Sequence, residues 1–191
     1  MKLGVLASGQ GSNLRNLADL YFEIAAVATN KAHCGAADIA RERRLPLAVF
    51  AQKDYDSLAA RDSAMAGWLQ GQGVELVVCA GYDRVLTAPL LEAFRGRIVN
   101  IHPSLLPAFA GGMDAVAQAL THGVKVTGCT VHLVDETVDA GPILAQAAVP
   151  VHDDDTPASL HSRIQIQEHR ILPEAIRLLS DRLAAARPPL R

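Results

Sequence analysis

The stretch Lys2-Leu3-Gly4-Val5-Leu6-Ala7-Ser8-Gly9-Gln10-Gly11-Ser12-Asn13 decides the fold of this 191-residue chain. Its first part, residues 2–7, is a short apolar run closed by glycines, which is typical of a buried strand. Leucines at helical spacing follow directly over residues 13–20. A strand, a glycine turn and a helix in this order predict the opening unit of an α/β fold.

The same alternation continues outward from this stretch. Apolar runs predict further strands at residues 23–29, 46–50, 74–80 and 97–101. Helical spacing predicts helices between them, at residues 36–44, 55–70 and 88–94. Strands that alternate with helices predict a Rossmann-like, mostly parallel central sheet with helices on both faces.

The pattern changes after residue 101, where a loop rich in proline and glycine is expected at 102–112. A helix at 113–122 and strands at 126–134 and 142–151, separated by an acidic turn, predict an antiparallel part of the sheet. A closing helix is expected at 156–180, interrupted or kinked at Pro173. We therefore expect a single domain over 1–183 and a flexible tail at 184–191.

Composition narrows the classes of function. Half of the residues are hydrophobic and the formal net charge is -2, so no broad basic surface for nucleic acid is expected. Cys34, Cys79 and Cys129 lie far apart without CxxC spacing, which argues against a zinc site or a disulfide framework. No signal peptide or apolar run of membrane-spanning length is visible. We expect a cytoplasmic protein that binds no metal and no membrane.

The segment Gly9-Gln10-Gly11-Ser12-Asn13 opens a predicted helix, where free N–H groups and the helix dipole favour phosphate. Leu14 stands where a third glycine would complete a dinucleotide motif, and the second strand ends in Asn30-Lys31 without a ribose-binding acid. A single terminal phosphate therefore fits better than NAD or ATP. The alternative is a plain tight turn in which Ser12 or Asn13 caps the helix.

Asn100 and His102 leave the same face of a predicted strand, at its carboxyl end, where open α/β sheets bind their ligands. An amide beside an imidazole suits a developing oxyanion, as in acyl transfer. The alternative is a core histidine whose amide neighbour closes a turn. Asp139, in the acidic turn at 135–142, could hold His102 in its protonated form if the two meet; otherwise the turn is a solvated hairpin.

Glu168 interrupts an apolar stripe formed by Ile164 and Leu172 in the closing helix. A carboxylate that faces inward needs a partner, which is either a basic side chain or an amine or hydroxyl of a ligand.

Together these segments resemble the phosphoribosylglycinamide formyltransferases of purine synthesis over residues 2–179. The motif Asn-x-His-Pro-Ser-Leu-Leu-Pro at 100–107 is specific to enzymes that use 10-formyltetrahydrofolate and to their relatives. The remaining matching segments are residues 6–14, 80–86, 128–132, 139–143 and 167–169.

The resemblance implies transfer of a formyl group from 10-formyltetrahydrofolate, a co-substrate, to the amine of 5-phosphoribosylglycinamide. It implies a phosphate-binding half at about 1–100 and a folate-binding, catalytic half at about 100–183, in a monomer or homodimer. The implied catalytic residues are Asn100, His102 and Asp139. The acceptor would bind Gly11, Ser12, Asn13, Gln165, Ile166, Gln167 and Glu168. The folate would bind Asp83, Arg84, Val85, Leu86, Asn100, Asp135, Glu136, Thr137, Val138 and Asp139.

The sequence departs from the family pattern in three places, one of which is the absence of a lysine or proline expected near Phe109. Family members often carry two histidines where this chain has Asp114 and Val116, and an arginine where it has Leu58, with Arg61 as the candidate substitute. The alternatives are a formyltetrahydrofolate hydrolase and a non-catalytic binding protein. The hydrolases carry an additional N-terminal domain, and the related tRNA formyltransferases a C-terminal one.

Overall fold

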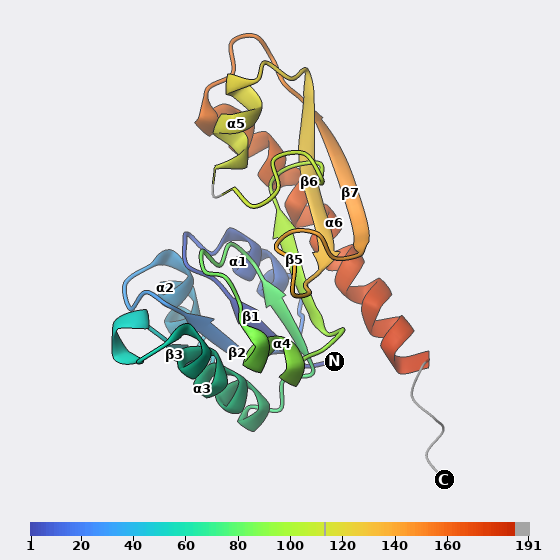
Figure 1. Cartoon of the computed structure of the whole chain (residues 1–191). Coiled ribbons are helices and arrows are strands. Elements are labelled where there is room, and N and C mark those ends of the chain that lie inside the picture. The colour runs from blue at the N-terminus through green and yellow to red at the C-terminus, as the bar shows by residue number, and fades with distance from the viewer. Residues whose placement is uncertain (113, 186–191) are drawn as a thin grey trace.

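The computed structural model describes residues 1–112 and 114–185, which form one seven-stranded sheet (Figure 1). Its strand order is β3-β2-β1-β4-β5-β6-β7. The first five strands run parallel, β6 pairs antiparallel with β5, and β7 pairs antiparallel with β6. The strands are β1 (Leu3–Leu6), β2 (Ile24–Thr29), β3 (Leu47–Val49), β4 (Leu76–Cys79), β5 (Ile98–His102), β6 (Val126–Leu133) and β7 (Ile143–Pro150).

Helices cover both faces of the sheet, because alternate strand residues point to opposite sides. One core packs α1, α2, α5 and α6 against the sheet, and the other packs α3 and α4. The expected fold class, with its antiparallel C-terminal part, is confirmed. The helices are α1 (Ser12–Asp19), α2 (Gly35–Glu42), α3 (Leu58–Gly71), α4 (Ala88–Ala93), α5 (Ala115–Thr121) and α6 (Pro157–Ala185), with a short 3₁₀ helix η1 (Gln52–Asp54).

Two helices differ from their predicted bounds by three or more residues at one end, and the others by one or two. The helix predicted from residue 55 begins at Leu58, because the Ser57 hydroxyl caps it by accepting from the Ala60 N–H at 3.0 Å. The closing helix, expected to be interrupted or kinked at Pro173, is continuous to Ala185, so it is not interrupted there, and residues 184 and 185 belong to the helix and not to the expected tail. The rest of the predicted tail, 186–191, lies outside the described residues, as does Met113. None of the described helices is long and apolar enough to span a bilayer.

The glycine loop after β1 packs backbone to backbone against the start of α2. Gly11 has a φ of 76°, and a Cβ built on it would lie 2.7 Å from the Ala36 Cα. A Cβ on Gly35 would lie 2.5 Å from the Gln10 carbonyl oxygen. Both positions therefore require glycine for close approach, and Gly11 also for its left-handed backbone.

A side chain of α1 explains why α6 passes through a proline. Pro173 has no N–H, so the carbonyl of His169, four residues earlier, loses its helical partner. The Asn16 side-chain amide donates to that carbonyl at 2.8 Å. The proline thus leaves a polar docking point at which α1 attaches to α6.

We expect Asn16→Ala to lower the free energy of unfolding by about 1 kcal/mol, because the His169 carbonyl loses its donor. In a Pro173→Ala background the helix regains its own N–H at this position, and the same substitution should cost less. Urea unfolding of the four proteins measures this coupling. An equal cost in both backgrounds would contradict the assignment.

Candidate active site

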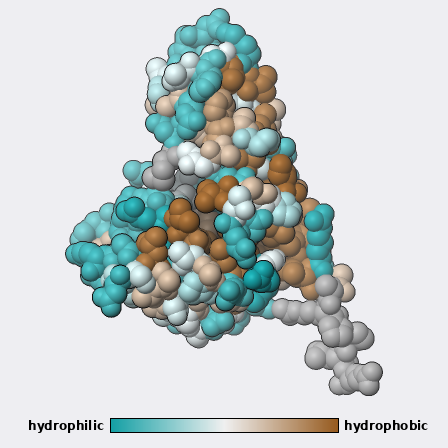
Figure 2. All heavy atoms as spheres, viewed as in Figure 1, coloured by the Kyte–Doolittle hydropathy of each residue, from teal (hydrophilic) through white to brown (hydrophobic). Residues whose placement is uncertain are grey.

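A cleft of about 390 Å³ lies at the carboxyl ends of β4 and β5. Figure 2 shows the molecule hollowed there, with hydrophobic side chains around the hollow. The hollow lies between the part formed by β1 to β5 with their helices and the projecting part that carries α5 and the outer ends of β6 and β7 (Figure 1). The loop after β4, the end of β5 and the loop between β6 and β7 line this cleft. This position follows the general rule for open α/β sheets.

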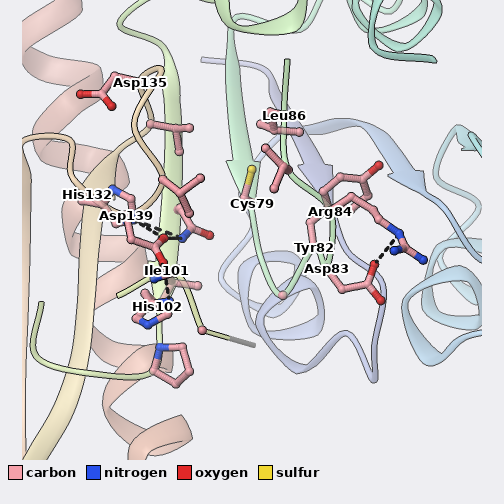
Figure 3. Close-up of a pocket in the computed structure, with 18 of the residues that line it drawn as sticks. Cys79, Tyr82, Asp83, Arg84, Leu86, Ile101, His102, His132, Asp135 and Asp139 are labelled. Carbon is pink, nitrogen blue, oxygen red and sulfur yellow. Dashed lines mark hydrogen bonds and ion pairs between the residues drawn. The ribbon is translucent and has the colours of Figure 1, made fainter. Parts of the chain in front are cut away.

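His102 and Asp139 meet on one side of the cleft (Figure 3), and Asn100 lines the same cleft. His102 Nδ1 lies 3.4 Å from Asp139 Oδ2, and the Asn100 side-chain nitrogen lies 3.4 Å from Asp139 Oδ1. The structure therefore brings together the three residues that the sequence resemblance singled out. Their side chains are largely withdrawn from solvent, since only 8% of His102 and 11% of Asp139 are exposed.

His132 is a fourth member of this cluster, and sequence reasoning gave it no role. Antiparallel pairing sets it directly opposite Asn100, and its Nε2 lies 3.1 Å from the Asn100 side-chain nitrogen and 3.6 Å from Asp139 Oδ1. Its Nδ1 lies 2.8 Å from the Leu133 carbonyl, which can only accept. With Nδ1 protonated, a neutral His132 ring accepts from Asn100 at Nε2, whereas a doubly protonated ring donates from Nε2 to Asp139. Aligning the predicted strands 97–101 and 126–134 in antiparallel register would have placed His132 beside Asn100.

Asp139 is an ionised carboxylate with several donors around it. The hydrogen bond with His132 is the largest influence that lowers its pKa, and the Gly111 N–H at 2.9 Å and the charge of His102 act in the same direction against burial. The His102 ring also faces acceptors on both sides, because its Nε2 lies 3.1 Å from the Phe109 carbonyl. An imidazolium would donate to both the carboxylate and this carbonyl.

A second polar group joins the start of α1 to α6. The Gln165 side-chain amide donates to the Ser12 hydroxyl at 2.7 Å, and the Asn13 side-chain amide donates to Glu168 at 2.9 Å. Gly11 precedes them as the N-terminal cap of α1. Residues more than 150 positions apart in the chain thus form one cluster, as the sequence resemblance implied.

The other two α6 residues expected to bind the acceptor, Ile166 and Gln167, do not take part in this cluster. Ile166 is 67% exposed, and the Gln167 side chain accepts from Arg170 at 3.1 Å. Neither has a contact with the start of α1 of the kind that Gln165 and Glu168 make.

Glu168 is 6% exposed, and burial raises the pKa of its carboxyl, although the Asn13 amide opposes that shift. The Asn13 side-chain oxygen is also buried and has no partner among the described residues. Buried polar groups of this kind are normally satisfied, so this corner is suited to a ligand that carries hydroxyl or amine donors.

The segments expected to bind folate line the cleft at positions Asp83, Arg84, Val85, Leu86, Asp135, Glu136, Val138 and Asp139. Thr137 does not line it; its N–H donates to Asp135 at 2.9 Å within the turn.

Asp83 anchors its side of the cleft. Burial alone would raise its pKa, but hydrogen bonds from Lys31, Asn30 and Ser8 lower it on balance. The Lys31 ammonium lies 2.6 Å from its carboxylate.

Arg61 cannot stand in for the arginine that the family carries at the position of Leu58. It is fully buried, pairs with Asp62 at 2.7 Å and donates to the Val85 carbonyl at 2.9 Å. Asp62 in turn accepts from the backbone N–H of Thr87 at 2.6 Å. Arg61 therefore holds the cleft-lining loop from beneath instead of reaching a ligand.

The two positions without the family histidines serve α5. Asp114 caps this helix by accepting from the Ala117 N–H at 3.2 Å, and Val116 packs in the core. Backbone of Gly111 and Gly112 lines the cleft nearby. Within the described ranges, no three His, Cys, Asp or Glu side chains are grouped so that they could hold a metal ion.

Comparison with known proteins gives a consistent result. Residues 1–176 match the family described as Formyl transferase. The phosphoribosylglycinamide formyltransferase of Mycobacterium tuberculosis is 45% identical over 94% of this chain and 85% of its own length. The human trifunctional purine biosynthetic protein adenosine-3 is 43% identical over 94% of this chain, which spans only 18% of that longer protein.

Solved structures agree with this match. The crystal structure of glycinamide ribonucleotide transformylase 1 from Symbiobacterium toebii superposes with a TM-score of 0.91 at 46% identity, covering 95% of this chain and 88% of that one. Sequence and fold are thus similar over the same nearly complete length, and the chain belongs to the formyl transferase family.

Proposed function

We propose that this protein transfers the formyl group of 10-formyltetrahydrofolate to the amine of 5-phosphoribosylglycinamide, giving the N-formyl product and tetrahydrofolate in purine biosynthesis. The observation that carries the proposal is the convergence of Asn100, His102 and Asp139 in one cleft. The names of the similar Mycobacterium and Symbiobacterium proteins support the same acceptor.

The proposed reaction begins when the acceptor amine attacks the formyl carbon, forming a C–N bond and a tetrahedral alkoxide. Asn100 and protonated His102 stabilise the alkoxide oxygen by hydrogen bonding. Their contacts with Asp139, both 3.4 Å, are longer than ordinary charge-assisted bonds, so these are the contacts that can open as the oxyanion forms.

Asp139 and His132 keep this pair in place. The Asp139 carboxylate balances the charge of the His102 imidazolium, and the lone pair of a neutral His132 ring fixes which side of the Asn100 amide carries the nitrogen. The C–N bond to the folate then breaks as the amine proton passes to the leaving folate nitrogen, directly or through water.

The acceptor is proposed to bind at the start of α1, with its phosphate on the N–H groups after Gly11 and its ribose hydroxyls on Glu168. Glu168 and the unpartnered Asn13 oxygen support this placement. Ile166 and Gln167 are kept as expected acceptor contacts, although no described interaction supports them. The folate is proposed to occupy the cleft between residues 83–86 and 135–139, with Thr137 kept as an expected contact outside the cleft lining.

The location and assembly of the protein are part of the proposal. We propose a cytoplasmic enzyme, with which the unpaired thiols of Cys34, Cys79 and Cys129 are compatible. A monomer or homodimer that binds neither nucleic acid nor membrane remains the prediction.

An ultraviolet assay with 10-formyltetrahydrofolate, with and without the glycinamide ribonucleotide, tests the proposal. Formyl release that requires the acceptor supports transfer. Release that ignores the acceptor supports the hydrolase alternative, and binding without release supports a non-catalytic protein.

Asn100→Ala and Asp139→Asn are each expected to lower kcat by about a hundred- to a thousandfold, since each weakens stabilisation of the alkoxide. Steady-state kinetics measure the loss, and circular dichroism checks the fold. Asp154→Asn, an exposed carboxylate outside the cleft, is the matched control and should keep normal turnover. Near-normal turnover in either cleft variant would refute the assigned roles.

Glu168→Gln is expected to raise the free energy of unfolding and to weaken binding of the acceptor ribonucleotide. Because the folded-state pKa of Glu168 is raised, its ionisation favours the unfolded state once the pH passes the unfolded-state pKa. The gain in unfolding free energy should thus be present near pH ~7 and absent near pH ~3, where the carboxyl is protonated in both states.

The same variant should raise the KM for the ribonucleotide about tenfold or more, through loss of a charged hydrogen bond. Glu174→Gln on the same helix is the control, since its side chain is 55% exposed. A stability gain that persists at low pH, or an unchanged KM, would contradict the two respective claims.

A further inference from the structure

The turn at residues 104–109, which follows β5, is held by side chains from the two strands beside it. The Thr130 hydroxyl on β6 donates to the Ser104 carbonyl at 2.7 Å and accepts from the Leu106 N–H at 3.0 Å. The Gln146 side-chain amide on β7 donates to the Leu106 carbonyl at 3.0 Å and to the Thr130 hydroxyl at 3.0 Å. The fully buried Thr130 hydroxyl is thereby saturated, with one bond donated and two accepted.

The far end of the turn touches the reacting side chains through its backbone. Phe109 has a φ of 58°, a conformation that a bulky residue keeps only where its surroundings enforce it. Its carbonyl lies 3.1 Å from His102 Nε2, and two residues later the Gly111 N–H donates to Asp139 at 2.9 Å. Ser104 braces the turn internally by donating to the Ala108 carbonyl at 2.6 Å.

From these contacts we propose that Gln146, acting through Thr130, is a positioning residue for formyl transfer. It fixes the 104–109 turn so that the Phe109 carbonyl and the Gly111 N–H orient His102 and Asp139. The inference rests on the proposed function, because it assigns Gln146 an effect on that reaction. It does not make Gln146 a catalytic residue, since Gln146 does not line the cleft.

The position of Gln146 predicts how the kinetics should change. The proposed acceptor site lies at the start of α1, which neither β7 nor the turn contacts through these bonds. Loosening the turn should therefore lower kcat and leave the KM for the ribonucleotide unchanged.

The variants are chosen to keep volume and remove hydrogen bonds. Gln146→Met removes the donors of a residue that is exposed to solvent, and Thr130→Val removes the hydroxyl with little change of shape. Thr127→Val is the matched control, because Thr127 lies buried on the same strand and its hydroxyl has no partner among the described residues. Thr130→Ser restores the hydroxyl and serves as the rescue.

We expect Gln146→Met and Thr130→Val to lower kcat about tenfold or more, with Thr130→Ser and Thr127→Val within about twofold of wild type. In ¹⁵N-edited NMR spectra, the hydrogen-bonded Nε2 proton of His102 should be lost or broadened in the first two variants alone. Kinetics in which Gln146→Met matches Thr127→Val would overturn the proposal, as would a lower kcat with an unchanged His102 resonance.

The same experiment separates this inference from the proposed function. A wild-type protein without acceptor-dependent turnover would refute the function. The His102 resonance in Gln146→Met would still decide whether the turn orients the imidazole.

Discussion

The antiparallel pairing of β6 with β5 is the constraint on which the cleft depends. It sets His132 opposite Asn100 and Thr130 opposite His102, so each of these two cleft residues has a polar partner at a fixed position on the next strand. A purely parallel sheet would have placed a crossover helix after β5 and would have left these side chains to flexible loops. The antiparallel strand β6 thus gives the end of an otherwise Rossmann-like sheet a rigid support for the proposed formyl-transfer site.

Polar residues in this protein are placed by strands and helices, and the loops between them adopt strained backbone where they complete the cluster. Asp139 and Phe109 both have left-handed backbone with φ near 54° and 58°. Each is enclosed by hydrogen bonds that fix it: Asp139 by Asn100 and Gly111, Phe109 by the imidazole that its carbonyl faces. Backbone strain at such positions persists only because the well-packed sheet and the hydrogen bonds around it enforce the conformation.

The sequence predicted the α/β alternation well because its signal is local: apolar runs, glycine turns and helical spacing lie within windows of about ten residues. The convergence of Asn100 and His102 was also local, since both leave one strand. His132 was missed because its importance arises from register between strands, which no single segment encodes. The helix is not interrupted at Pro173 for a similar reason, because the donor that satisfies the freed carbonyl comes from Asn16, on a different helix. Arg61 shows the same limit, since only its burial and its bond to the Val85 carbonyl show that it supports a loop instead of replacing the family arginine.

The cluster of Ser12 and Asn13 with Gln165 and Glu168 has a consequence for biosynthesis on the ribosome. The first βα unit leaves the exit tunnel early and can acquire local structure, but its inward-facing Asn13 meets Glu168 only after nearly the whole chain has been made. Until then the opening glycine turn lacks the α6 side chains that form the other side of the proposed acceptor site. A nascent chain should therefore gain its first ligand-holding capacity abruptly, late in translation, instead of residue by residue.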